Sequence, residues 1–586
     1  MSRSLIPARH ASPSAGSARV ASERTGRMST QRAPVSRQAL PHGPSGSFRR
    51  RPAAGVVCRG LVLLACLAAP LTAAAQAPAG DKAADVPGQA ITQPLFDEAR
   101  SPFDGLFRPA EPTLALARFG PAAPGESAAL TAYLRDSLPA FTASGQLEDD
   151  PRRECPGCPR RRPLRAVGGA AMVNVIFNMV NRLREENDEF KVSFSSWWDN
   201  LEYGFEWDYN SFEINQFGHP YQGGLYFNAG RANGLSFWES APLAAFGSAT
   251  WEYFGEKNHA SINDFVTTTM GGIALGEMFH RAGWMVRDSS VTESRLKKEL
   301  LAMALDPVTG INRLLSGDAS RVSSNPEGLK PTSTASDIEV GVQWNGRVNE
   351  RAVNSTGEPF LGLNLGYNDL YSSPYKMPFD AFTLALRLGG GSSISEALVR
   401  GRLYGRFRAK ADQQALPTEF LVVQGYDFQK NGIFEYGGQS VLAGVSHLFR
   451  VSDSAQLLVF GVGGPIVLGA IRSPLVTEAP AEGGDPEEAH LKRTYDFGPG
   501  AQLSGGAALR VGGFPLARLR YASFYLRTIS AVEGEAGKHY AQVLRLDVLA
   551  PLWRNFRLGV SGDYLNRATY YPTTPDVHQW LPQLRV

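Results

Sequence analysis

The second half of the chain alternates apolar and polar residues with a period of two. From Ser336 onward, Ile338, Val340, Val342 and Trp344 alternate with polar residues or glycine. The same alternation returns in the segments 361–368, 382–388, 399–408, 544–548 and 556–564. Strands of a soluble sandwich average about 5–6 residues, whereas these runs reach about 10 residues, with aromatic residues near their ends. The pattern predicts an outer-membrane β-barrel of about 12 antiparallel strands, apolar outside and polar inside.

Helical spacing replaces this alternation in the first half of the chain. Val173, Ile176 and Phe177 predict an amphipathic helix within 166–186, with its apolar face on other helices rather than on lipid. Further helices are expected over 221–236, 240–254 and 261–281, the second starting at Ser240 and the third at Ser261. Residues 306–313 are expected to form a turn-rich connector. A mainly helical domain is therefore predicted to precede the barrel.

The N-terminal part resembles an export signal. Three arginines at 49–51 precede the apolar segment 60–71, and small residues offer cleavage after Ala75 or Ala77. Met28 is an alternative start that gives a more ordinary signal. The expected organisation is a disordered extension with signal peptide over 1–77, a low-complexity periplasmic linker over 78–165, a helical domain over 166–326 and the barrel over 327–586. The predicted location is the bacterial outer membrane.

Charge and cysteine content narrow the classes of function. The formal net charge of +3 over 586 residues suggests no nucleic-acid partner. Cys155 and Cys158 form a CxxC motif that, in an exported chain, predicts a small-loop disulfide. Zinc would need two further ligands, and none lies nearby in the sequence. No cofactor and no metal are predicted, and the expected partners are outer-membrane lipid and the barrel-assembly machinery.

Four polar residues of the predicted helical domain are candidates for chemistry: His219, Glu252, Glu256 and Asp264. Glu252 and Glu256 lie four residues apart on one helical face, so burial would raise the pKa of one carboxyl and allow acid–base chemistry. The alternatives are an ion pair with Arg231 for the glutamates and a helix cap for Asp264. His219 with the two glutamates is a metal site only in principle, because no HExxH spacing occurs.

Four arginines of one predicted strand, Arg400, Arg402, Arg406 and Arg408, share a face by alternation. Charges facing lipid are costly, so this face is expected to line the lumen or to contact a plug.

Several clustered motifs resemble a known bacterial family. They are Trp197-Trp-Asp199, the His219–Tyr226 segment, Trp251–Glu256, Ser261–Asp264 and the glycine-rich 271–277. Together they resemble domain of unknown function 3943 over roughly residues 195–315. The resemblance implies an envelope protein without an assigned activity. Within this region Arg231, Asn263 and Glu277 are further candidates for a structural or binding role.

These patterns lead to one function and two alternatives. We expect an outer-membrane barrel whose helical domain packs at the periplasmic mouth or plugs the lumen, with a structural, transport or envelope-assembly role. The first alternative is an envelope hydrolase that acts on lipid or glycan through the His/Glu/Asp group. The second is a soluble periplasmic binding protein built on a β-sandwich.

Overall fold

The structure is a computed structural model that describes most of the chain after residue 158. The described ranges are 159–184, 189–207, 211–289, 294–320, 325–348, 351–352, 357–371, 375–389, 394–408, 418–473, 495–512, 514–531, 536–553 and 556–586. The predicted signal peptide, most of the predicted linker, and Cys155 and Cys158 lie outside these ranges.

Helices occupy the part of the described chain before residue 330. The α-helices are α3 (Pro163–Arg184), α4 (Phe194–Tyr203), α5 (His219–Ala232), α6 (Phe237–Phe254), α7 (Ile262–Arg287), α8 (Arg295–Leu305) and α9 (Pro307–Ser316). A π-helical turn, η3 (Ile214–Gly218), leads into α5, and the 3-10 turns η4 (Asp318–Ser320) and η5 (Glu327–Leu329) follow α9. Two short strands, β1 (Phe205–Glu206) and β2 (Ala260–Ser261), pair in parallel.

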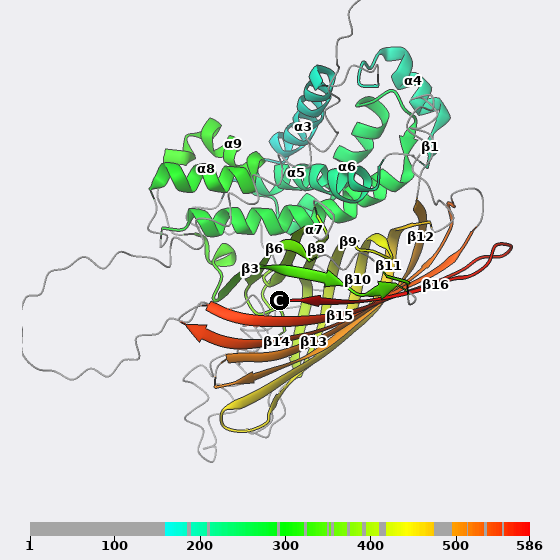
Figure 1. Cartoon of the computed structure of the whole chain (residues 1–586). Coiled ribbons are helices and arrows are strands. Elements are labelled where there is room, and N and C mark those ends of the chain that lie inside the picture. Colours follow the sequence, from blue (N-terminus) through cyan, green and yellow to red (C-terminus); the bar gives the residue numbers. More distant parts are fainter. Residues whose placement is uncertain are drawn as a thin grey trace, which may run out of the picture. The chain divides into compact units, whose positions relative to one another are not determined.

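Twelve antiparallel strands then close into a barrel (Figure 1), which confirms the predicted fold class. They are β3 (Thr334–Asn345), β6 (Glu358–Tyr367), β7 (Phe382–Gly389), β8 (Glu396–Arg408), β9 (Thr418–Lys430), β10 (Glu435–Arg450), β11 (Ala455–Arg472), β12 (Tyr495–Val511), β13 (Phe514–Arg527), β14 (Lys538–Trp553), β15 (Phe556–Tyr570) and β16 (Val577–Arg585). Neighbouring strands follow chain order, and β16 closes the ring on β3. Outside the barrel, β4 (Arg347–Val348) pairs with β5 (Arg351–Ala352).

The inner face of the barrel is identified by contacts between strands that are not neighbours. Glu396 on β8 is ion-paired with Arg545 on β14, and several strands separate these two around the ring. Such a contact crosses the lumen. Residues that lie on the same face of their strand as Glu396 or Arg545 therefore point inward. Alternate residues of each strand therefore point outward.

Outward-facing side chains of one part of the barrel are covered by the helices. Val399, Tyr426 and Phe428 alternate with lumenal residues, yet all three are buried in one apolar cluster with residues of α5, α6 and α7. The Tyr426 hydroxyl donates to the Gln216 carbonyl at 2.7 Å, and the Gln424 amide donates to the Met270 carbonyl at 2.8 Å. These helices therefore pack on the outer wall, whereas a position at the mouth or inside the lumen was expected.

The lumen is instead filled in part by the connection between β6 and β7. Tyr371 of this connection stacks on Phe460 with ring centroids 4.5 Å apart, and its carbonyl accepts a hydrogen bond from Ser446. Leu370 and Tyr371 share an apolar cluster with inward-facing Leu421 and other lumenal side chains. A second apolar cluster, which includes Tyr436 and Phe524, occupies another part of the lumen.

The remaining outer wall exposes apolar side chains to the surroundings. The exposed residues on β3 and β12–β16 include Val340, Leu503, Leu519, Leu544, Leu546, Val548, Leu552, Leu558, Val560 and Leu584. This is the outer surface that a transmembrane barrel presents to lipid.

Helix starts differ from the predicted ones where another capping residue is better placed. α6 begins after Ser236, whose hydroxyl accepts from the Glu239 backbone N–H in a complete capping box, so the predicted start at Ser240 was wrong. The predicted connector at 306–313 is largely α9, because Asp306 caps it and Pro307 suits the first helical position. Ser261 caps α7 as predicted.

α3 forms as predicted and buries part of the expected apolar face. Its contacts with other helices run through Ala166, Ala170 and Val173, and Phe177 is partly buried against the same helices. Ile176, expected on the buried face as well, is exposed. Among the described residues α3 is the one helix long and apolar enough to cross a membrane, and 17% of its apolar window is buried. One such helix is weak evidence for a span.

Glycine lets α5 and α7 approach closely. A Cβ at Gly223 would lie 1.9 Å from the Thr268 carbonyl oxygen, and one at Gly272 would lie 2.4 Å from the Gly223 carbonyl carbon. Because both obstacles are backbone atoms, neither helix can yield without moving as a whole. Gly223 and Gly272 therefore permit the close packing of α5 and α7.

Replacing Gly223 with alanine should therefore destabilise the helical domain. We expect Gly223→Ala to cost about 1–3 kcal/mol or more from overpacking. Gly168→Ala on α3 is the matched control, because a Cβ there meets nothing within 4 Å and alanine gains up to about 1 kcal/mol in helix propensity. Thermal unfolding of the helical circular-dichroism signal in detergent micelles would measure both. Equal midpoints for the two variants would contradict the packing.

Candidate functional site

Three of the four candidate residues of the helical domain come together at helix ends. His219 is the first residue of α5, Glu252 lies in the last turn of α6, and Asp264 lies in the first turn of α7. One ligand atom from each lies within 4.8 Å of those from the other two. All three residues are buried. Sequence spacing alone could not show this convergence, because the three residues belong to separate helices.

Local hydrogen bonds hold the two carboxylates of this group in place. Glu252 Oε2 accepts from the Ser261 backbone N–H at 2.8 Å. Asp264 Oδ1 accepts from Asn263 Nδ2 at 3.1 Å and lies 3.6 Å from His219 Nε2. Asn263, a candidate structural residue, thus orients a carboxylate. One imidazole nitrogen and two carboxylates form a donor set that suits a metal ion.

Glu256 is buried in the turn after α6, but it does not belong to the convergent group. Its backbone carbonyl accepts from Asn200 Nδ2 at 3.1 Å, which ties α4 to this turn. Because His219, Glu252 and Asp264 are all buried, the hydrolase alternative would require these side chains to become accessible to a lipid or glycan.

Arg231 pairs with Glu277, whereas Glu252 and Glu256 were its expected partners. Arg231 Nε lies 2.8 Å from Glu277 Oε2, and Arg281 Nε lies 2.8 Å from Glu277 Oε1. Arg281 also donates to the carbonyls of Gly328 and Pro378 at 3.0 Å each. Sequence reasoning missed Arg281, although its spacing of four residues from Glu277 is a recognisable helical pair.

A second buried histidine–aspartate pair joins α7 to α9. His280 Nδ1 lies 3.0 Å from Asp306 Oδ2, and the other oxygen of Asp306 accepts from the Thr309 backbone N–H. Burial alone raises the pKa of Asp306, but the hydrogen bond with His280 and the charge of Arg287 outweigh it, so this pKa lies below its usual value. Asp306 therefore stays ionised as the cap of α9.

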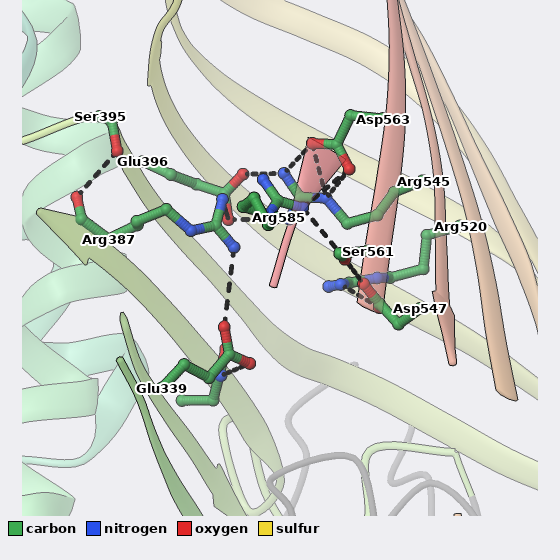
Figure 2. Close-up of polar contacts among 11 residues, drawn as sticks. Glu339, Arg387, Ser395, Glu396, Arg520, Arg545, Asp547, Ser561, Asp563 and Arg585 are labelled. Carbon is green, nitrogen blue, oxygen red and sulfur yellow. Dashed lines mark hydrogen bonds and ion pairs between the residues drawn. The ribbon is translucent and has the colours of Figure 1, made fainter. Parts of the chain in front are cut away.

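The barrel lumen holds a network of buried ion pairs, shown in Figure 2. Arg545 contacts both Glu396 and Asp563 at 2.9 Å, and Arg585 contacts Asp563 at 2.7 Å. Arg387 extends the network to Glu396 at 3.4 Å. Next to this network, Asp547 is ion-paired with Arg520 and accepts a hydrogen bond from the Ser561 hydroxyl. Sequence reasoning did not single out this cluster, because all five residues, Arg387, Glu396, Arg545, Asp563 and Arg585, lie on strands whose polar positions look like ordinary alternation.

Two of the four predicted lumenal arginines point into the lumen. Arg400 Nη2 lies 2.6 Å from Asp427 Oδ1. Arg402 is fully buried between Asp380 at 2.9 Å and Glu419 at 3.0 Å. Asp380 belongs to the β6–β7 connection, so Arg402 fastens this connection to the wall.

The other two arginines follow a β-bulge that changes the register. Arg402 pairs with Val423, but Tyr404 pairs with Val422, so one residue of β8 is skipped. Arg406 then lies opposite outward-facing Phe420 and is exposed, contrary to the expectation of a lumenal position. Both Arg406 and the backbone of Arg408 belong to the end of β8, where an outward charge near the rim costs little.

A cavity of about 150 Å³ lies within the lumen. Its walls combine apolar side chains with Arg400, Arg518, Arg520 and Arg545, and with the acids Glu396 and Asp427. It is large enough for several water molecules or a small anion.

Comparison with known proteins gives a family for the helical part. Residues 204–308 match the family "Domain of unknown function (DUF3943)". This confirms the predicted resemblance. The DUF3943 segment runs from β1 to the start of α9 and so contains all three convergent residues. No curated protein matches the chain. The comparison also found the solved structure "Crystal Structure of Pseudomonas aeruginosa OccK8 (OprE)", with 10% sequence identity to this chain. The match covers 43% of this chain and 97% of that one, and its TM-score of 0.12 is too low to support an inference about the fold.

Removal of the central lumenal arginine should destabilise the barrel. Arg545→Met would leave Glu396 and Asp563 buried without their shared partner, which typically costs about 3–5 kcal/mol. The control is Arg472→Met, because Arg472 is half exposed and its pair with Glu435 is worth about 0–1 kcal/mol. The temperature at which the folded band disappears on unheated gels would report both. A normal transition for Arg545→Met would show that the network does not stabilise the barrel.

Proposed function

We propose that the chain is an integral outer-membrane protein whose closed barrel is a scaffold that holds the DUF3943 domain in the bilayer. The observation that carries this proposal is the covered outer wall. Outward-facing Val399, Tyr426 and Phe428 would contact lipid in a bare barrel, yet they pack against the helices. A domain that occupies this wall lies beside the barrel at the level of the membrane.

Two further features support a membrane position. The uncovered wall exposes apolar side chains of β3 and β12–β16, as lipid contact requires. α3 exposes apolar residues such as Met172, Val175, Met179 and Leu183, which suit lipid better than water. Export through the N-terminal signal and insertion by the barrel-assembly machinery belong to this proposal, as does outer-membrane lipid as the surrounding partner.

The connections between strands favour one orientation. At the barrel end where β16 finishes, four residues separate β10 from β11, two separate β12 from β13, and two separate β14 from β15. Outer-membrane barrels have short turns on the periplasmic side. We therefore place the start of β3 and the β6–β7 connection on that side, and the end of β11 and the start of β12 on the side of the cell exterior.

The filled lumen favours a scaffold over an open pore. The β6–β7 connection packs inside through Leu370 and Tyr371, and the ion pairs around Arg545 cross the interior. Water-filled porins leave this space open. The cavity with its four arginines supports a second candidate, a gated passage for small anions, and conductance measurements distinguish the two.

The proposed membrane position predicts a strong effect of charge on the uncovered wall. Leu546 is exposed in the middle of β14, so Leu546→Arg should cost about 2–4 kcal/mol and reduce insertion. Leu552→Arg near the end of the same strand is the control, with an expected cost of about 0–1 kcal/mol. The heat-modifiable fraction in outer-membrane preparations would be compared. Similar insertion of both variants, or recovery of the wild type in the soluble periplasmic fraction, would contradict the proposal.

The proposed scaffold role also predicts that the barrel does not conduct ions. Purified protein in planar lipid bilayers should show no steady conductance. Arg402→Gln weakens the hold on Asp380 in the β6–β7 connection, so we expect frequent channel openings. Arg472→Gln, a change at an exposed rim pair, should stay silent. Steady conductance of the wild type would favour the anion passage, and silence of both variants would show that Arg402 does not secure the connection.

A further inference from the structure

We propose that His219, Glu252 and Asp264 bind one divalent cation, for which zinc fits best, and that this ion ties the ends of α5, α6 and α7 together. This inference goes beyond the proposed membrane scaffold. It depends on the internal geometry of the helical domain and not on where the protein resides.

The first argument is the convergence of the donor atoms. One atom from each residue lies within 4.8 Å of the others. His219 Nε2 and Asp264 Oδ1 are 3.6 Å apart. A tetrahedral ion with bonds of about 2.0–2.2 Å separates its ligands by roughly 3.3–3.6 Å. The present arrangement thus needs only small side-chain rotations to coordinate an ion.

The second argument is electrostatic. His219 is 7% exposed, and Glu252 and Asp264 are each 1% exposed. Two carboxylates held close together in a buried site repel each other, and removing each charge from water carries a desolvation cost. A divalent cation offsets both effects at once. An imidazole in the donor set favours zinc or a similar transition metal over magnesium and calcium, which prefer oxygen ligands.

The third argument is that neighbouring groups orient the ligands. The Ser261 backbone N–H donates to Glu252 Oε2, and the Asn263 amide donates to Asp264 Oδ1. Hydrogen bonds of this kind are common around ligands of bound metal ions, which they hold in one orientation. The Ser261 hydroxyl caps α7 by accepting from the Asp264 backbone N–H.

A comparison within the same domain sharpens the proposal. His280 and Asp306 also form a buried pair, but they lie 3.0 Å apart in a direct hydrogen bond, and Thr309 completes their surroundings. The nearby Glu277 is neutralised by Arg231 and Arg281. Among the residues that the structure describes, His219, Glu252 and Asp264 are the one group of His, Cys, Asp and Glu side chains whose donor atoms lie close enough together to hold a metal ion.

The experiment measures zinc in the full-length protein purified in detergent without chelators. We expect about one zinc per chain by elemental analysis. After treatment with a chelator the thermal midpoint should fall, and it should recover when zinc chloride is added. His219→Gln and Asp264→Asn should each reduce bound zinc at least tenfold and abolish the recovery. His280→Gln is the matched control and should retain zinc.

A second control addresses the CxxC motif, whose thiolates also bind zinc. The double variant Cys155→Ser and Cys158→Ser should keep its zinc, and X-ray absorption at the zinc edge should show nitrogen and oxygen neighbours without sulfur. The absorption measurement uses the wild type, so it decides the question even if His219→Gln fails to fold. Wild-type protein without zinc that also gains no stability from added zinc would overturn the proposal. Sulfur neighbours, or zinc lost from the cysteine variant, would overturn it too.

Discussion

Because successive side chains of a strand point to opposite faces, neighbouring residues of this barrel lie in different environments. Asp427 pairs with Arg400 in the lumen, whereas Tyr426 and Phe428 on either side of it pack against helices. The same alternation leaves Leu546 on the exposed wall beside lumenal Arg545. The charged network, the covered wall and the exposed apolar wall all depend on this single constraint.

Alternation also explains how much of the fold could be predicted. A period of two is visible in one sequence, and it indicated both the barrel and its strand number. What covers an outward-facing residue is not visible, because an apolar side chain such as Val399 suits lipid and a helix equally well. The position of the helices therefore could not be predicted. The register change after Arg402 also left no signal, since the bulge skips one residue in an otherwise regular strand.

The candidate site shows the same division between local and distant information. A short-range signal was reliable where it was specific: Ser261 caps α7 as predicted. The burial of His219, Glu252 and Asp264 could be suspected from their apolar neighbours in the sequence. The proximity of their side chains could not be predicted, because it depends on how α5, α6 and α7 pack against one another in the folded domain. Gly223 and Gly272 permit the close crossing of α5 and α7.

The β6–β7 connection joins the two faces of the barrel wall. Phe379 stacks on Phe237 of α6 with ring centroids 5.6 Å apart, while the next residue, Asp380, pairs with Arg402 in the lumen. Phe379 adopts a positive φ of 58°, a conformation that is costly for a bulky residue and persists only when its surroundings hold it. Its backbone N–H donates to the Arg402 carbonyl, and Arg281 of α7 binds the carbonyl of Pro378 just before it. The helices outside and the ion pairs inside therefore act on the same few residues. A shift of α6 or α7 along the wall would strain the contact that secures the lumen, so the position of the helical domain and the closure of the barrel are physically coupled.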